Sequence, residues 1–191
     1  MLSQFVPLGY GSGYGSPIPV DKKAIALRLG FQDTFNNPVH GSSLRGMDDM
    51  EVAFLEVKIM TAISRIAQDL ISFSSEESGF VSLPQGFTTG SSLMPNKRNP
   101  DFLEMLQGYS SEALGKLTTS ISILMNKGTG YHREFQLSKD KVIAYTVRII
   151  DILKALKMLF SGIEIESSDR SLRVAHTWSK YVETATGIAC L

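Results

Sequence analysis

The sequence predicts an all-α protein, in which long antiparallel helices form part of a central helical bundle. Three long stretches carry apolar side chains at alternating spacings of three and four residues, which is the spacing of one helix face. No stretch shows the strict apolar–polar alternation that is typical of a half-buried strand. A seven-residue apolar pattern kept over several turns favours long helices that pack nearly antiparallel.

The chain before these helices is predicted to be mostly loop. Residues 1–20 are rich in glycine, serine and proline. Prolines rather than a helix follow the glycines, so the spacing does not fit a nucleotide-binding glycine loop. Asp21 is a suitable N-cap for a short helix that runs through Leu29 and ends at Gly30. Residues 31–46 are again predicted to be loop.

The buried face of each long helix is predicted from the apolar spacing. The first helix has Asp48 and Asp49 at its start, and its face is Val52, Leu55, Ile59, Ile63, Ile66, Leu70 and Phe73. The face of the second is Leu103, Leu106, Leu114, Leu117, Ile121 and Leu124, with Gly128 and Gly130 closing the helix. The face of the third is Val142, Tyr145, Ile149, Ile152, Leu156 and Leu159, and Gly162 ends it.

Further apolar residues widen two of these faces. They are Val57, Met60 and Ile71 in the first helix and Val147, Ile150 and Leu153 in the third. A three-helix unit alone would leave this surface exposed, so we expect the bundle to continue through other segments or other subunits. The alternative is a thick core within one chain. Residues 1–162 are predicted to be a partial bundle domain, and residues 163–191 the beginning of a small C-terminal helical domain.

Composition narrows the classes of protein to consider. The chain has 191 residues, 43% apolar and 20% charged, as in an ordinary globular domain. Its net charge of zero gives no electrostatic footprint for nucleic acid. We see neither a signal peptide nor an apolar run long enough to cross a membrane. The single cysteine, Cys190, cannot form an internal disulfide, which fits a reducing compartment, and we expect a cytoplasmic protein.

The segment from residue 78 to residue 99 is the strongest functional signal. A loop this long between helices is usually functional, although an ordinary surface connection is the alternative. Near its end, Gly90, two hydroxyls and Lys97 precede a predicted helix start, with Asn99 as N-cap. A helix start and a lysine favour a bound anion, so we expect a carboxylate next to a hydroxyl that does chemistry.

This segment resembles the signature of the fumarase/aspartase superfamily. The superfamily pattern runs Gly-Ser-Ser-x-x-Met-Pro-x-Lys-x-Asn, and residues 90–99 follow it with one spacer fewer. The residues on either side of this signature are similar to those of argininosuccinate lyases. A second stretch further along the chain is also similar, and a third, shorter match lies near the N-terminus. The flanks are Ser74–Glu77, Gly79–Val81, Leu83–Pro84 and Phe87–Thr89, the second stretch is Tyr131–Gln136, and the opening match is Pro7–Gly9. The resemblance implies reversible β-elimination of argininosuccinate to arginine and fumarate, in a homotetramer and without cofactor or metal.

The resemblance also implies catalytic roles for three residues. Ser91 would be the general base, although a serine hydroxyl is a poor base unless N–H groups and positive charge stabilise its alkoxide. Lys97 would stabilise the carbanion-like intermediate. Glu104 would orient the catalytic histidine. The plain alternatives are a solvated lysine and a solvent-facing glutamate, and Ser92 is interpreted as a residue that shapes the loop.

Four further residues are implied to bind the substrate: Asn99, Tyr131, Arg133 and Gln136. In argininosuccinate lyases the second stretch reads Tyr-Asn-Lys/Arg-Asp-x-Gln, so His132 and Glu134 are departures here. An aromatic cap on the end of the bundle is the alternative for Tyr131.

Two parts of the family pattern have no match in the chain. One is the segment with the histidine that donates the proton, and the other is a segment that binds the substrate carboxylates. His40, His132 and His176 lie in other contexts and are predicted to be structural or surface residues. We therefore expect a truncation, a proteolytic remnant or one half of a split lyase. Its missing histidine would come from another segment, in a homotetramer or from a complementing N-terminal segment, and the chain alone should have little or no activity. The alternatives are adenylosuccinate lyase, another lyase of the superfamily, and a non-enzymatic crystallin-like protein.

Overall fold

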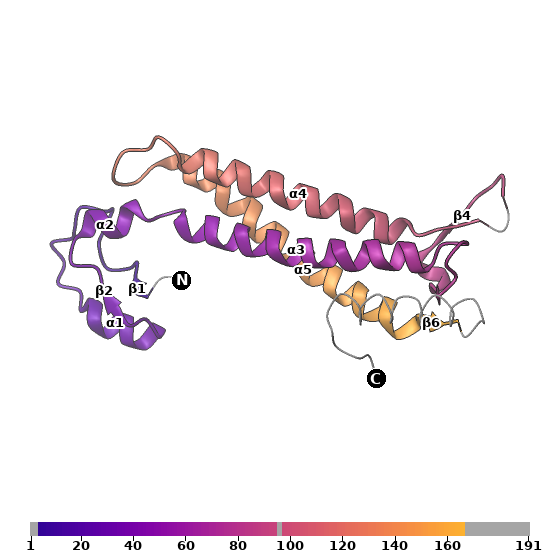
Figure 1. Cartoon of the computed structure of the whole chain (residues 1–191). Coiled ribbons are helices and arrows are strands. Elements are labelled where there is room, and N and C mark those ends of the chain that lie inside the picture. The colour runs from indigo at the N-terminus through magenta and orange to yellow at the C-terminus, as the bar shows by residue number, and fades with distance from the viewer. Residues whose placement is uncertain (1–3, 95–96, 167–191) are drawn as a thin grey trace, which may run out of the picture. The chain divides into compact units, whose positions relative to one another are not determined.

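The computed structural model describes residues 4–94 and 97–166, and Figure 1 traces their elements along the chain. Three long helices account for about half of the described residues, and the predicted all-α fold is confirmed. The helices are α1 (Lys22–Leu29), α2 (Pro38–Ser43), α3 (Met47–Phe73), α4 (Asp101–Leu124) and α5 (Gln136–Gly162), with 3-10 turns η1 (Gln85–Phe87) and η2 (Arg133–Phe135). The strands are β1 (Phe5–Val6), β2 (Asp33–Thr34), β3 (Val81–Ser82), β4 (Thr89–Gly90), β5 (Arg98–Asn99) and β6 (Glu164–Ile165). The predicted small C-terminal domain lies almost wholly outside the described residues, as do His176 and Cys190.

The chain divides into two compact units, and each takes a part of every long helix. The first unit holds residues 1–59 and 111–149, and the second holds residues 60–110 and 150–191. No helix of the described residues is long and apolar enough to cross a membrane.

The first unit begins with a small α/β substructure. Helix α1 follows the prediction, because the Asp21 side chain accepts a hydrogen bond from the Ala24 N–H at 2.9 Å and Gly30 ends the helix with a φ of 80°. Helix α2 lies within residues 31–46, so the prediction of loop there was wrong. Its start has ordinary signals, since Asn37 caps it and Pro38 follows. The parallel pair of β1 and β2 escaped prediction because two-residue strands show no period.

Long-helix segments form the core of the first unit. Ala53, Leu117 and Val142 form one buried cluster from α3, α4 and α5. Two serine side chains of the same unit are also buried. The Ser138 hydroxyl donates to the Ser120 hydroxyl at 3.3 Å, and both side chains are buried. Buried polar groups are tolerated when they are paired in this way.

The predicted faces are right for α5 and partly wrong for α3 and α4. All six predicted residues of α5 are buried. In α3, however, Leu55, Ile59 and Ile66 are each about two-fifths exposed, and Ala53, Met60 and Ala67 are buried instead. In α4, Leu114 and Ile121 are exposed, and Ala113 and Ser120 are buried. The error has a simple cause: these helices have two apolar faces, and the buried one includes small residues such as Ala53, Ala67 and Ala113 beside large apolar ones.

The second unit packs its parts of the long helices around buried leucine, isoleucine and methionine side chains. Strand β3 pairs antiparallel with β6, which ties the loop after α3 to the end of α5. Phe80 packs edge-on against Phe73, with ring centroids 5.7 Å apart. These contacts fix the start of the loop that carries the signature residues.

Candidate functional site

The signature segment forms a β-hairpin, which the sequence did not predict. Strand β4 pairs antiparallel with β5, and Thr89 stands opposite Asn99 in the register. Helix α4 begins at Asp101, and the Pro100 carbonyl accepts the N–H of Glu104 at 3.1 Å. Asn99 therefore lies in the strand rather than at the predicted N-cap position. The loop of the hairpin carries Ser91 and Lys97.

The Ser91 hydroxyl lies close to two backbone donors. Its Oγ accepts the N–H groups of Leu93 and Met94, each at 3.3 Å. Ser91 is half-buried, whereas Ser92 is exposed. Donors aimed at an oxygen stabilise its charged form, so this arrangement provides N–H groups of the kind that a serine alkoxide requires.

The start of α4 is a weaker source of positive field than expected. Asp101 and Glu104 both lie in its first turn, and their charges offset the partial positive charge of the helix end. Lys97 is exposed, and its backbone N–H donates to the Met94 carbonyl at 3.0 Å. The positive groups of the loop itself are therefore its backbone N–H groups and the side chain of Lys97, which Arg98 follows.

Two contacts tie the base of the hairpin to α4. The Thr89 hydroxyl donates to the Asp101 carboxylate. The rings of Phe87 and Phe102 pack edge-on with centroids 5.0 Å apart. Glu104 follows on the same first turn, with an exposed side chain. The structure thus brings Ser91, Lys97, Asn99 and Glu104 into one hairpin-and-helix substructure of the second unit.

The other three predicted site residues lie in the first unit: Tyr131 and Arg133 between α4 and α5, and Gln136 at the start of α5. Tyr131, Arg133 and Gln136 are all exposed. The loop that carries them is closed by a 3.0 Å ion pair between Lys127 and Glu134. The backbone N–H of Glu134 and the Lys127 ammonium both lower the pKa of the Glu134 carboxyl. The His132 ring bonds the Gly128 carbonyl at 2.8 Å, in agreement with the predicted structural role.

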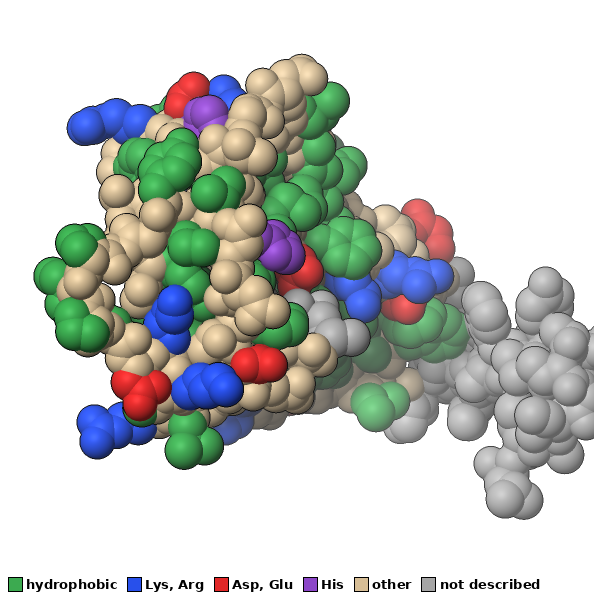
Figure 2. Space-filling view, turned by 90° about the vertical axis from the view of Figure 1, so that its left-hand side faces the viewer, with side chains coloured by type: hydrophobic (Ala, Val, Ile, Leu, Met, Phe, Trp, Pro, Cys, Tyr) green, Lys and Arg blue, Asp and Glu red, His purple; other side chains and the backbone are tan. Residues whose placement is uncertain are grey.

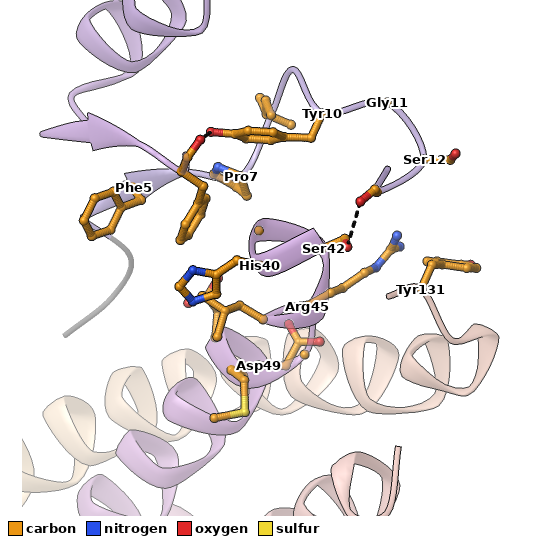
Figure 3. Close-up of a pocket in the computed structure, with 18 of the residues that line it drawn as sticks. Phe5, Pro7, Tyr10, Gly11, Ser12, His40, Ser42, Arg45, Asp49 and Tyr131 are labelled. Carbon is orange, nitrogen blue, oxygen red and sulfur yellow. Dashed lines mark hydrogen bonds between the residues drawn. The ribbon is translucent and has the colours of Figure 1, made fainter. Parts of the chain in front are cut away.

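The sequence did not predict a pocket in the first unit (Figure 3). Its volume is about 1020 Å³, the upper end of the range for small-molecule sites. Residues 4–13 and 35–51 line most of it, together with Tyr131 and Lys139. Figure 2 shows apolar, basic and acidic side chains interspersed on the face of this unit. Only two sequence features pointed to this region: the short family match at Pro7–Gly9 and the prediction that Tyr131 binds substrate.

Charges of both signs line the pocket. Arg45 and Lys139 are basic, and Asp48, Asp49 and Glu51 are acidic. Burial raises the pKa of the Asp49 carboxyl, and the neighbouring Asp48 raises it further. Lys139 and Arg45 act in the opposite direction. Among the described residues, no group of three or more histidine, cysteine, aspartate or glutamate side chains could hold a metal ion.

Comparison with known proteins assigns the chain to a family. Residues 3–115 match the family described as Lyase, and the chain belongs to it. The argininosuccinate lyase of Thermotoga neapolitana is 38% identical over 160 residues, which cover 84% of this chain and 40% of that protein. The argininosuccinate lyase of Acaryochloris marina is 32% identical over 182 residues, which cover 94% of this chain and 38% of that protein. The chain thus spans about two-fifths of the length of these relatives.

Solved structures agree on the fold. EDDS lyase in complex with formate superposes with a TM-score of 0.72 at 22% identity, covering 97% of this chain and 38% of that one. The fumarate lyase:delta crystallin from Brucella melitensis bound to cobalt gives a TM-score of 0.67 at 19% identity, covering 96% and 42%.

Proposed function

We propose that the chain contributes part of the active site of an argininosuccinate lyase, which splits argininosuccinate into arginine and fumarate. The observation that carries the proposal is the Ser91 hydroxyl held by two backbone N–H groups in the hairpin loop. The chain belongs to the Lyase family, and relatives at 32–38% identity are argininosuccinate lyases. A hydroxyl arranged to carry negative charge suits the removal of a proton from carbon next to a carboxylate.

In the proposed reaction, the Ser91 alkoxide takes a proton from the carbon next to a carboxylate of the succinate part. The electron pair left on that carbon delocalises into the carboxylate, where Lys97 stabilises the added charge. The pair then forms the double bond of fumarate while the bond to the guanidino nitrogen breaks. That nitrogen takes a proton from an acid on a complementing segment and leaves as arginine. Glu104 orients this acid, and Asn99 contacts the succinate part.

The arginine part of the substrate is assigned to Tyr131, Arg133 and Gln136. Their exposed side chains, on a loop closed by the Lys127–Glu134 ion pair, support the assignment. The pocket beside Tyr131 provides volume, and Lys139 together with the acidic side chains provides charges of both signs for a zwitterionic group.

The segment that carries the proton-donating histidine of the family has no match in the chain, so we propose that a complete site draws on more than one chain. The assembly would be a homotetramer, or this chain with a complementing N-terminal segment. Residues 1–162 would form its share of the bundle, residues 163–191 would begin a further helical domain, and the cytoplasm would be its compartment. The wide apolar surfaces of the long helices support an assembly of this kind.

The test is the Ser91→Ala variant in a complex supplied with the complementing segment, with fumarate release followed by ultraviolet absorbance. We expect a loss of turnover of about a hundredfold or more. Ser92→Ala, one residue along the same loop, is the matched control and should lose much less. Unchanged turnover in Ser91→Ala would remove this serine as the base. If the complex turns over adenylosuccinate and not argininosuccinate, the substrate assignment is wrong. An assembled complex that acts on neither compound would indicate a non-enzymatic scaffold.

A further inference from the structure

Ser43, the last residue of α2, and Arg45, which follows the helix, both contact the loop that carries Tyr131. The Arg45 guanidinium lies over the Tyr131 ring, with its central carbon 4.6 Å from the ring centroid. One residue earlier, the Gly130 N–H donates to the Ser43 hydroxyl oxygen at 3.0 Å. The Ser43 hydroxyl in turn donates to the Val39 carbonyl at 2.6 Å, so its oxygen is fixed on α2 as an acceptor. Two neighbouring residues of the loop, Gly130 and Tyr131, are therefore each held by a contact from the segment of Ser43 and Arg45.

The backbone before Tyr131 has little freedom to move. Gly130 is buried and has a φ of 103°, a conformation that side-chain-bearing residues rarely adopt. A Cβ added there would lie 3.1 Å from the Tyr14 hydroxyl. The backbone conformation at Gly130 thus sets the direction in which the Tyr131 side chain points. The Tyr131 ring and Arg45 both line the pocket (Figure 3).

We propose that Arg45 is a positioning residue, which fixes the ring of Tyr131 for contact with the arginine part of the substrate. This inference rests on the proposed function. A planar guanidinium on a ring face restricts the ring plane without using the phenol hydroxyl. That hydroxyl remains available to the substrate. Arg45 acts through Tyr131 and does not itself touch the substrate.

The first test asks whether the contact exists in solution and is independent of activity. The 191-residue chain is prepared with ¹³C-labelled tyrosine rings, and the Tyr131 signal is assigned by its loss in Tyr131→Phe. We expect Arg45→Gln to shift this signal. Lys22→Gln is the matched control, because the Lys22 ammonium lies over the Tyr10 ring at 4.8 Å in the same unit. It should shift Tyr10 and leave Tyr131 unchanged. An unmoved Tyr131 signal in Arg45→Gln overturns the proposal.

The second test asks whether the contact affects turnover in the complemented enzyme. We expect Arg45→Gln to raise KM for argininosuccinate about two- to fivefold, with little change in kcat. Arg45→Lys should recover part of the loss, because an ammonium still attracts the ring but lacks the planar stack. Lys22→Gln should leave KM unchanged, and an equal rise there would show a general loosening of the unit instead.

A double variant separates positioning from direct binding. If Arg45 acts through Tyr131, Arg45→Gln adds nothing to the KM of Tyr131→Leu. A further rise would mean that Arg45 contacts the substrate itself, and the positioning role would be wrong. If the wild-type complex shows no turnover, the proposed function fails, while the tyrosine spectra still decide whether Arg45 orients the ring.

Discussion

The carboxyl group of Glu56 is buried, so its ionised form destabilises the folded state. It is 4% exposed in α3, and its Oε1 accepts the Thr146 hydroxyl at 2.6 Å. Burial raises its pKa above the ordinary value of 4.5, while the bond from Thr146 and the charge of Lys116 act the other way. Because the native state binds this proton more tightly than the unfolded state does, stability falls as pH rises through the interval between the two pKa values.

Replacing Glu56 with glutamine should remove this penalty. We expect Glu56→Gln to match the parent in urea unfolding below the ordinary carboxyl pKa and to become the more stable of the two toward neutral pH. The glutamine oxygen can still accept from Thr146. A difference that does not change with pH would contradict the assignment of the penalty to ionisation.

Glu112 provides the opposite control in the same unit. Burial acts to raise its pKa, but hydrogen bonds and charge from Lys116 and Arg148 outweigh burial and lower it. Its nitrogen–oxygen distances are 3.1 Å to Lys116 and 2.7 Å to Arg148. A carboxyl group whose pKa is lowered by folding stabilises the native state at pH values above its unfolded-state pKa. This stabilisation is lost as the pH falls through the folded-state pKa. Glu112→Gln should therefore lose stability near neutral pH and equal the parent in acid.

Gly46, at the turn into α3, combines two constraints. Its φ is 87°, and an added Cβ would lie 2.7 Å from a methyl group of Leu124. We expect Gly46→Ala to lose about 2–4 kcal/mol of unfolding free energy, from strain and overpacking together. Gly30→Ala separates the two, because Gly30 has a φ of 80° and nothing within 4 Å. An equal loss in both variants would show that the Leu124 contact contributes nothing.

Among the elements, the hairpin of β4 and β5 is short and depends on α4 for its position. Its ladder is two residue pairs long, and a two-stranded hairpin is at best marginally stable alone. The Thr89–Asp101 hydrogen bond and the Phe87–Phe102 pair attach it to the helix start. The geometry around the Ser91 hydroxyl is thus set by the first turn of a rigid helix.

Loosening this attachment should reduce turnover without removing any site residue. We expect Thr89→Val, which keeps the shape and removes the hydroxyl, to cost the hairpin about 0.5–1.5 kcal/mol because the Asp101 carboxylate loses an exposed hydrogen bond. In the complemented enzyme, kcat should fall. Thr88→Val is the control, since its hydroxyl donates to the Gln85 carbonyl at 3.4 Å and not to α4. Equal kcat values for both variants would contradict the role given to the Asp101 contact.

For the whole molecule, the second apolar face of each long helix is the dominant feature. In the first unit, Phe54, Leu114, Ile143 and Val147 are all more than half exposed. Large apolar surface of this kind indicates an interaction site. The proposed assembly explains why these large apolar side chains stand outside the core of a single chain.

A lysine on this surface should disrupt the assembly and spare the fold. We expect Val147→Lys to keep the helical circular dichroism of the parent while its mass in solution, measured by light scattering, falls toward one chain. Val147 is 54% exposed, so the lysine is tolerated in a single chain. Ala24→Lys, at an exposed position of α1, should leave the mass unchanged. An unchanged mass in Val147→Lys would exclude this part of α5 from the interface.

The sequence alone determined the fold class, the three long helices and the signature segment, because these depend on local spacing and on residues that are neighbours in the chain. The Asp21 cap, the Gly30 end and the buried face of α5 follow from such short-range rules. It did not determine which face of α3 is buried, because Leu55 and Ala53 both satisfy an apolar pattern and only packing against α4 and α5 selects the alanine.

Tertiary structure decided what surrounds the chemistry. The hairpin exists because Thr89 meets Asn99 across a loop, and the two donors on Ser91 follow from that turn. The pocket and the Arg45–Tyr131 contact join residues more than eighty positions apart, beyond the reach of any spacing rule. Local sequence determines which residues can do chemistry, whereas their orientation and burial depend on contacts that form only when distant segments meet.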